Sequence, residues 1–180
     1  MSEARSFLCR VGPFDTRILA ALAFFVPFLV RALPEVLMGE YLVGFDTISY
    51  YVPVALRWAH GGARFWEVVA SAPLLYGLLV QLLISGVPLV VLLKVLPPVL
   101  HGFLGLSIYG YARLGFEWSL KKSLAASLLA VLYFVALRIS WDMLRSELGL
   151  IFLFAFLILL GGGWESKPWR RFGLLASVGI

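Results

Sequence analysis

The chain has 180 residues, of which 62% are hydrophobic and 14% charged, and its mean hydropathy is +0.96. Soluble domains are about half apolar and about one quarter charged, so this composition is typical of a membrane protein. The formal net charge of +5 comes without a basic helix or a basic–aromatic stripe, and we expect no nucleic-acid partner. The single cysteine, Cys9, excludes an internal disulfide framework.

The first long apolar stretch predicts an uncleaved membrane-spanning helix over about residues 17–38. Arginines precede it, as they would a signal peptide, but no small-x-small cleavage site follows. Arg31 and Glu35 lie four residues apart on one face of its outer end, where they can pair or extend toward the headgroups.

A longer polar segment follows, and we expect residues 39–94 to form an outer loop. Within it, Tyr51, Ala55 and Trp58 recur at helical spacing and Gly61-Gly62 provides a stop. This pattern predicts an amphipathic helix lying on the membrane surface.

Residues 72–93 are apolar but interrupted at Gly86-Val-Pro88, so they can be read as a span or as a surface segment. The positive-inside rule decides between the two. If they do not span, three short inner segments carry three basic residues each, and the opposite choice places two of these clusters outside. The clusters are Arg5, Arg10 and Arg17; Arg113, Lys121 and Lys122; and Lys167, Arg170 and Arg171. We therefore expect residues 72–93 not to span.

The resulting fold class is all-α: a polytopic transmembrane helical bundle in the cell membrane, with a cytoplasmic N-terminus and amphipathic juxtamembrane helices in the outer loop. The apolar runs do not alternate with period two, which excludes a β-barrel. A further span begins near Phe172 and stops at Ile180, so we expect a longer parent protein whose C-terminal part is a partner of this module. The expected spans cover about residues 17–38, 95–112, 118–137, 144–160 and 172–180, the last incomplete.

Two acidic segments then face the same outer side, one around Asp46 and one around Asp142. Paired carboxylates at the membrane surface could bind a divalent cation such as Mg or Mn, or take a proton from an acceptor hydroxyl. Arg138 and Arg145 could neutralise the phosphate of a lipid headgroup. Structural explanations remain open: Asp46 could cap a helix, and Asp142 could pair with Arg145 in a solvated loop.

Other motifs indicate less. His101, in the second span, is most simply a neutral histidine hydrogen-bonded between helices, although intramembrane ionisable groups are often functional. Lys94 stands at a span end and is expected to extend toward the interface. The sequence contains no Walker motif, zinc-ligand pattern or G-x-S-x-G elbow.

The order of these parts resembles the membrane-embedded C-type (GT-C) glycosyltransferases, such as the dolichyl-phosphate-mannose protein mannosyltransferases and the aminoarabinose lipid A transferases. Those proteins begin with one span and an outer loop whose early acidic residue matches Asp46. Ala72-Pro73-Leu-Leu-Tyr76 loosely matches their Pro-led juxtamembrane segment. A Lys-led span, a basic inner loop and an outer Arg-x(n)-Asp loop follow in the same order. The chain departs from the family in having Thr47 where the mannosyltransferases have a second acidic residue.

The resemblance implies transfer of a hexose or pentose from a polyprenyl-phosphate-linked donor to an acceptor on the extracytoplasmic face. Asp46 would be the catalytic base and Asp142 would assist, as electrostatic partner or metal ligand. Arg138 or Arg145 would contact the donor phosphate. Tyr50 and Tyr51, beside Asp46, are assigned contacts to the acceptor or the outer loop. The competing classes are a transporter module and a non-catalytic membrane scaffold subunit.

Overall fold

The computed structural model of the protein describes residues 13–62, 64, 66–67 and 73–161. Over these residues the chain forms helices and turns with no β-strand, which confirms the all-α expectation for them. In chain order the elements are α2 (Pro13–Leu37), the π-helix η1 (Thr47–Tyr51), α3 (Val52–Ala59), α5 (Pro73–Ile84), α6 (Leu89–Leu114), α7 (Leu120–Leu132), α8 (Phe134–Asp142) and α9 (Leu144–Gly161).

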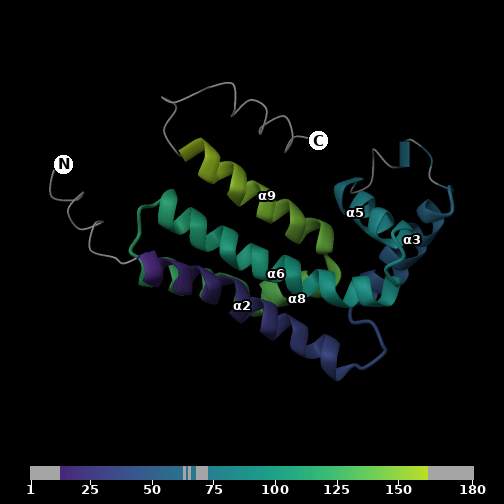
Figure 1. Cartoon of the computed structure of the whole chain (residues 1–180), viewed down its shortest axis with the longest axis horizontal. Coiled ribbons are helices and arrows are strands. Elements are labelled where there is room, and N and C mark those ends of the chain that lie inside the picture. Colours follow the sequence, from purple (N-terminus) through teal and green to yellow (C-terminus); the bar gives the residue numbers. More distant parts are fainter. Residues whose placement is uncertain (1–12, 63, 65, 68–72, 162–180) are drawn as a thin grey trace.

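The two longest helices, α2 and α6, pack against each other along the molecule (Figure 1). At 1.5 Å per residue their 25 and 26 residues extend over about 37 and 39 Å, enough to cross a hydrocarbon core of about 30 Å. Glycines of α6 permit the close packing. A Cβ at Gly105 would overlap the backbone of Ala23 on α2, and one at Gly102 would lie 2.8 Å from the ring of Phe24.

The next two helices are separated by a break at Tyr133, which is extended with φ −62° and ψ 139°. The axes of α7 and α8 differ there by 58°. The single continuous helix expected over residues 118–137 is therefore not what forms. The break leaves the last carbonyls of α7 without partners from a continuing helix, and His101 of α6 binds one of them. After α8, α9 packs back along α6.

The apolar stripe predicted in the outer segment forms, but it faces another helix of that segment rather than lying free for the membrane surface. Tyr51, Ala55 and Trp58 are buried and form a core with Leu75 and Leu79 of α5. The apolar face of α3 is thus covered by α5 from the same outer segment.

The predicted interruption at Gly86-Val-Pro88 is also present. Helix α5 ends at Ile84, Gly86 has a φ of +90°, and α6 starts directly after Pro88. With 12 residues α5 extends over only about 18 Å, too short to span alone. Because α6 begins before the expected span at 95–112, Lys94 lies inside a helix rather than at its end.

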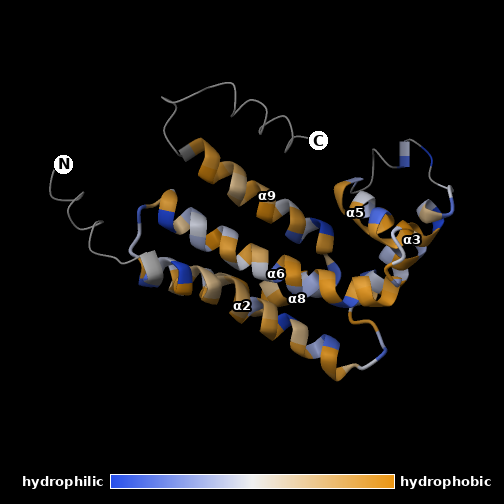
Figure 2. Ribbon diagram, in the orientation of Figure 1, coloured by the Kyte–Doolittle hydropathy of each residue, from blue (hydrophilic) through white to orange (hydrophobic). Residues whose placement is uncertain are grey.

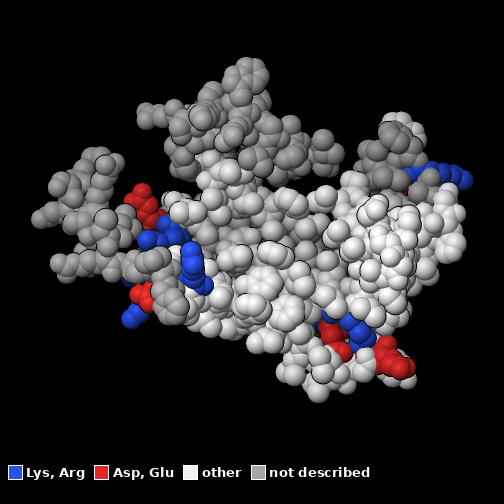
Figure 3. All heavy atoms as spheres, viewed as in Figure 1, with Lys and Arg blue, Asp and Glu red and all other residues white. Residues whose placement is uncertain are grey.

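The surface separates charge from apolar area. On the face shown in Figure 3, acidic and basic side chains gather at the two ends, and the helices between them are predominantly hydrophobic (Figure 2). Helix α2 also leaves large apolar side chains more than half exposed at helical spacing: Phe25, Leu29, Leu33 and Val36. Within the described part of the chain, the helices α2 and α6 are long and apolar enough to cross a membrane, and the bent α7–α8 pair would make a third such span. These are the features of a membrane protein.

Helices α2 and α9 coincide with the segments expected at 17–38 and 144–160. The incomplete span at 172–180, the basic cluster from Lys167 and Cys9 lie outside the described residues.

Candidate functional site

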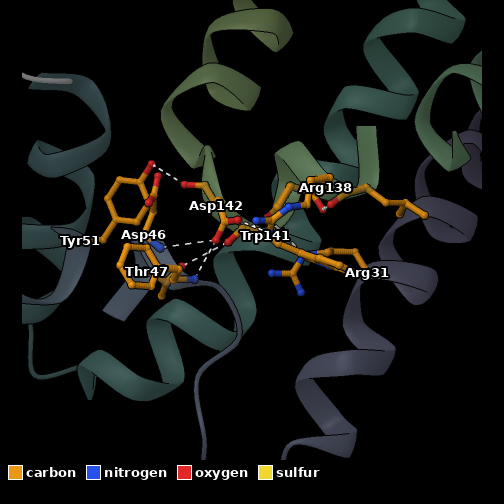
Figure 4. Close-up of polar contacts among 10 residues, drawn as sticks. Arg31, Asp46, Thr47, Tyr51, Arg138, Trp141 and Asp142 are labelled. Carbon is orange, nitrogen blue, oxygen red and sulfur yellow. Dashed lines mark hydrogen bonds and ion pairs between the residues drawn. The ribbon is translucent and has the colours of Figure 1, made fainter. Parts of the chain in front are cut away.

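The two acidic segments predicted from the sequence meet at the corner between α8 and α9 (Figure 4). The Oδ1 atom of Asp142 accepts hydrogen bonds from the backbone N–H groups of Phe45, at 2.8 Å, and Asp46, at 3.4 Å. Its Oδ2 atom pairs with Arg138, one turn earlier on α8. Asp142 is only 8% exposed, so its carboxylate is largely shielded from water, although the Arg138 side chain that pairs with it is 58% exposed. Both oxygens of its carboxylate are therefore engaged in holding the structure together.

Gly44 permits this docking because the loop passes directly over the α8 backbone. Its φ of +105° is a conformation that side-chain-bearing residues rarely adopt. A Cβ at this position would overlap the carbonyl oxygen of Trp141 and lie 3.1 Å from the hydroxyl of Thr47. That hydroxyl donates to the same Trp141 carbonyl at 3.5 Å. The acidic loop is thus fitted to the α8 terminus by backbone contacts that only glycine allows.

Tyr51 extends the contact toward α5. Its phenol, in a side chain only 3% exposed, donates to the Asp142 backbone carbonyl at 3.3 Å, and its ring centroid lies 6.0 Å from that of Tyr76. Burial raises the pKa of Tyr51 above its ordinary value of 10.0, although a backbone hydrogen bond from Arg145 opposes the shift. Burial also raises the pKa of Tyr76. Two protonated tyrosines therefore stand beside the α8–α9 corner.

Asp46 and Arg145 supply opposite charges beside these tyrosines. The negative charge of Asp46 contributes to raising the pKa of both Tyr51 and Tyr76, and the positive charge of Arg145 opposes it at both. Asp46 precedes η1 but makes no side-chain cap hydrogen bond. Arg145 is exposed and forms no ion pair with any carboxylate of the described chain. A carboxylate and a guanidinium, each available for a ligand, thus act on the same pair of phenols.

A buried ionic network supports the corner from the α2 side. Arg31 is fully buried; its Nη1 donates to Glu35 at 2.7 Å and its Nε donates to the Ser140 backbone carbonyl of α8 at 3.3 Å. Lys94 of α6 donates to the Glu35 backbone carbonyl at 2.9 Å. The predicted Arg31–Glu35 pair is confirmed, and the network joins the ends of α2, α6 and α8.

The predicted site residues do not all take part in the same set of interactions. The charges of Asp46 and Arg145 both act on Tyr51, whereas Asp142 and Arg138 pair with each other where the loop is anchored to α8. The alternative pairing of Asp142 with Arg145 does not form. Tyr50 is 57% exposed and takes no part in these contacts.

Sequence reasoning did not identify Gly44 and Thr47 as docking residues. A glycine two residues before the acidic position is a signal for close backbone approach, but the spacing alone does not name its partner. Tyr76 was recognised only as part of a motif, and its contact with Tyr51 depends on how α3 packs on α5.

In comparisons with known proteins, no family model, no curated protein and no solved structure matches this chain.

Proposed function

We propose that the chain is a module of a membrane-embedded glycosyltransferase, related in its order of parts to the GT-C enzymes, that uses a polyprenyl-phosphate-linked sugar donor. The acceptor is glycosylated on the extracytoplasmic face of the cell membrane, and the N-terminus is cytoplasmic. Four spans carry the module: α2, α6, the bent α7–α8 pair and α9, whose 18 residues extend over about 27 Å.

One observation carries the proposal: the Asp46 loop is bound to the α8–α9 corner although the two lie 96 residues apart in sequence. In this docked position the Asp46 carboxylate makes no capping hydrogen bond to η1, and its charge acts, with that of Arg145, on Tyr51 and Tyr76. A base and a cation on a common aromatic surface, at the end of apolar helices, suit a substrate with a lipid tail and a phosphate.

The proposed chemistry assigns one task to each charge. Asp46 accepts the proton of the acceptor hydroxyl as its oxygen attacks the sugar carbon that is bonded to phosphate. Positive charge develops on the sugar ring, as it does in glycoside hydrolysis, and the nearby carboxylate stabilises it. The leaving lipid phosphate gains negative charge, which Arg145 stabilises by hydrogen bonding.

The roles first expected for Asp142 and Arg138 change accordingly. Asp142 is a positioning residue, because its carboxylate holds Phe45 and Asp46 in place and pairs with Arg138. A divalent cation fits this donor set poorly, since both Asp142 oxygens already accept from protein donors. Among the described residues no group of three or more His, Cys, Asp or Glu side chains is gathered for a metal. No step of the proposed mechanism involves a metal ion.

The test uses the purified chain in lipid nanodiscs with polyprenyl-phosphate-linked mannose or aminoarabinose, and measures release of polyprenyl phosphate. Asp46→Asn should lower turnover by about 100-fold or more, the contribution typical of a general base. Arg145→Gln should weaken competitive inhibition by polyprenyl phosphate. The matched control is Glu117→Gln, an exposed carboxylate in the α6–α7 turn, which should leave turnover unchanged. Full turnover by Asp46→Asn would remove the assigned base.

A further inference from the structure

A second pair of ionisable residues lies deep between the helices, away from the Asp46 loop. His101 of α6 and Glu147 of α9 are both fully buried, and His101 Nδ1 lies 2.6 Å from Glu147 Oε1. The other ring nitrogen, Nε2, lies 3.1 Å from the backbone carbonyl oxygen of Val131 on α7. One imidazole therefore links three helices, and it does so next to the break at Tyr133.

The hydrogen bonds fix where the protons lie. A carbonyl oxygen only accepts, so His101 Nε2 must carry a hydrogen that it donates to Val131. Between Nδ1 and Oε1 there is then one hydrogen. It belongs either to an imidazolium facing a carboxylate or to a carboxylic acid facing a neutral imidazole. Both arrangements hold the same number of protons and have no net charge.

The surroundings distinguish the two arrangements. Glu147 Oε2 is buried and has no hydrogen-bond partner among the described residues. An ionised carboxylate with an unsatisfied buried oxygen is much less favourable than a carboxylic acid whose carbonyl oxygen lacks a partner. Among the described residues, Arg31 is a further cation that would favour a Glu147 carboxylate, and it is already paired with Glu35. The cation that would favour the carboxylate is thus largely neutralised.

We propose that Glu147 is a carboxylic acid that donates to neutral His101, and that this uncharged pair binds the free Val131 carbonyl and fixes the α7–α8 break. The pair is a positioning element for the corner, because Glu147 lies two residues beyond Arg145 at the start of α9. A bend held at this point directs α8 toward the loop that Asp142 anchors. The inference does not depend on the proposed transferase activity.

Vibrational and nitrogen spectroscopy of the full chain in nanodiscs at neutral pH test the protonation directly. The infrared spectrum should contain the carbonyl stretch of a protonated carboxylic acid, and Glu147→Gln should remove it. The chain has two histidines, so ¹⁵N-histidine labelling of a His60→Gln variant isolates His101. Its nitrogens should report a neutral ring protonated at Nε2. An imidazolium signal, or an acid band that survives in Glu147→Gln, overturns the proposal.

A second measurement tests the positioning role through the reactivity of a cysteine at the buried Thr47, in a Cys9→Ala background. Glu147→Gln keeps a donor toward His101 Nδ1, so its labelling rate should stay within about twofold of the parent. His101→Leu leaves the Val131 carbonyl unpaired, and the rate should rise by about tenfold, the effect of one lost buried hydrogen bond.

The matched control is Ser127→Ala, which removes another buried α7–α6 hydrogen bond, to the Gly105 carbonyl at 2.6 Å, without touching the pair. Its labelling rate should change by less than about threefold, well short of one lost bond at the corner. A rise in Ser127→Ala that equals the rise in His101→Leu contradicts the positioning role. The infrared and nitrogen spectra do not require the His101→Leu variant, so they test the protonation of the pair even if that variant does not fold.

Discussion

Replacing Gly44 by alanine perturbs the outer loop where it passes closest to α8. The new Cβ would occupy the position of the Trp141 carbonyl oxygen, so either the loop or the end of α8 must move. The positive φ of +105° is also unfavourable for alanine. Gly86 offers a matched control in which only the backbone strain applies, because its φ is +90° and an added Cβ would meet no atom within 4 Å.

The expected losses of stability differ between Gly44→Ala and Gly86→Ala. Backbone strain of this kind costs about 1–3 kcal/mol, which is the whole effect expected for Gly86→Ala. In Gly44→Ala the loop must also give up at least the charge-assisted bond from Phe45 to Asp142, which contributes about 1.5–3 kcal/mol. Together these contributions destabilise the docked loop by roughly 2.5–6 kcal/mol.

The assay follows the labelling rate of a cysteine introduced at Thr47, which is 1% exposed in the docked loop. An effect of about 3 kcal/mol raises the population of the open loop by about two orders of magnitude, and the labelling rate should rise with it. Gly86→Ala lies in another turn and should leave the rate unchanged. Equal rates in the two variants, or no increase in Gly44→Ala, would refute the docking inferred from these contacts.

Three further predictions concern the anchor, the phenols and the helix packing. Asp142→Asn should weaken loop docking by about 1–2 kcal/mol in the same labelling assay, because charge-assisted hydrogen bonds become neutral ones. Arg138→Gln should change loop docking by less than about 1 kcal/mol, because the arginine of that ion pair is 58% exposed. The pKa of Tyr51 is raised in the folded state, so the stability that this residue contributes is complete below a pH of about 10 and is lost as the pH rises toward the folded pKa. Tyr51→Phe should therefore flatten the alkaline decline of the thermal unfolding temperature. An unchanged dependence of the unfolding temperature on pH would contradict the raised pKa. Gly105→Ala should lower stability in denaturant titrations by about 1–3 kcal/mol through overpacking against α2, whereas Gly110→Ala, which meets only a flexible Ile158 methyl at 3.2 Å, should have a smaller effect.

Much of the helical organisation follows from local sequence. The apolar stripe of Tyr51, Ala55 and Trp58 could be predicted from their spacing, although its burial against α5 could not. The interruption before α6 could be predicted from Gly86 and Pro88, because it is a property of neighbouring residues.

The break at Tyr133 could not be predicted in this way. No proline or glycine marks it, and the partner of the freed Val131 carbonyl, His101, comes from a helix 30 residues earlier. Breaks that are compensated by a distant side chain depend on tertiary packing, which periodicity does not encode.

The candidate site was predicted in part. Asp46, Tyr51 and Arg145 were selected by residue type and position, and the charges of Asp46 and Arg145 both act on the Tyr51 phenol. The role of Asp142 could not be deduced from its sequence neighbours, because its hydrogen-bond partners are backbone N–H groups 97 and 96 residues away. Backbone donors leave no mark on side-chain patterns.

In the topology proposed for the transferase module, the Asp46 loop and the α8–α9 corner form one site on the extracytoplasmic face, and the α6–α7 turn lies on the cytoplasmic face. Three exposed serines allow a matched test by single Ser→Cys substitution in a Cys9→Ala background: Ser49, Ser146 and Ser119. With a membrane-impermeant maleimide on intact cells, positions 49 and 146 should react, and position 119 should react only after permeabilisation. Reaction of positions 146 and 119 from the same side of the membrane, or of positions 49 and 146 from opposite sides, would contradict this topology.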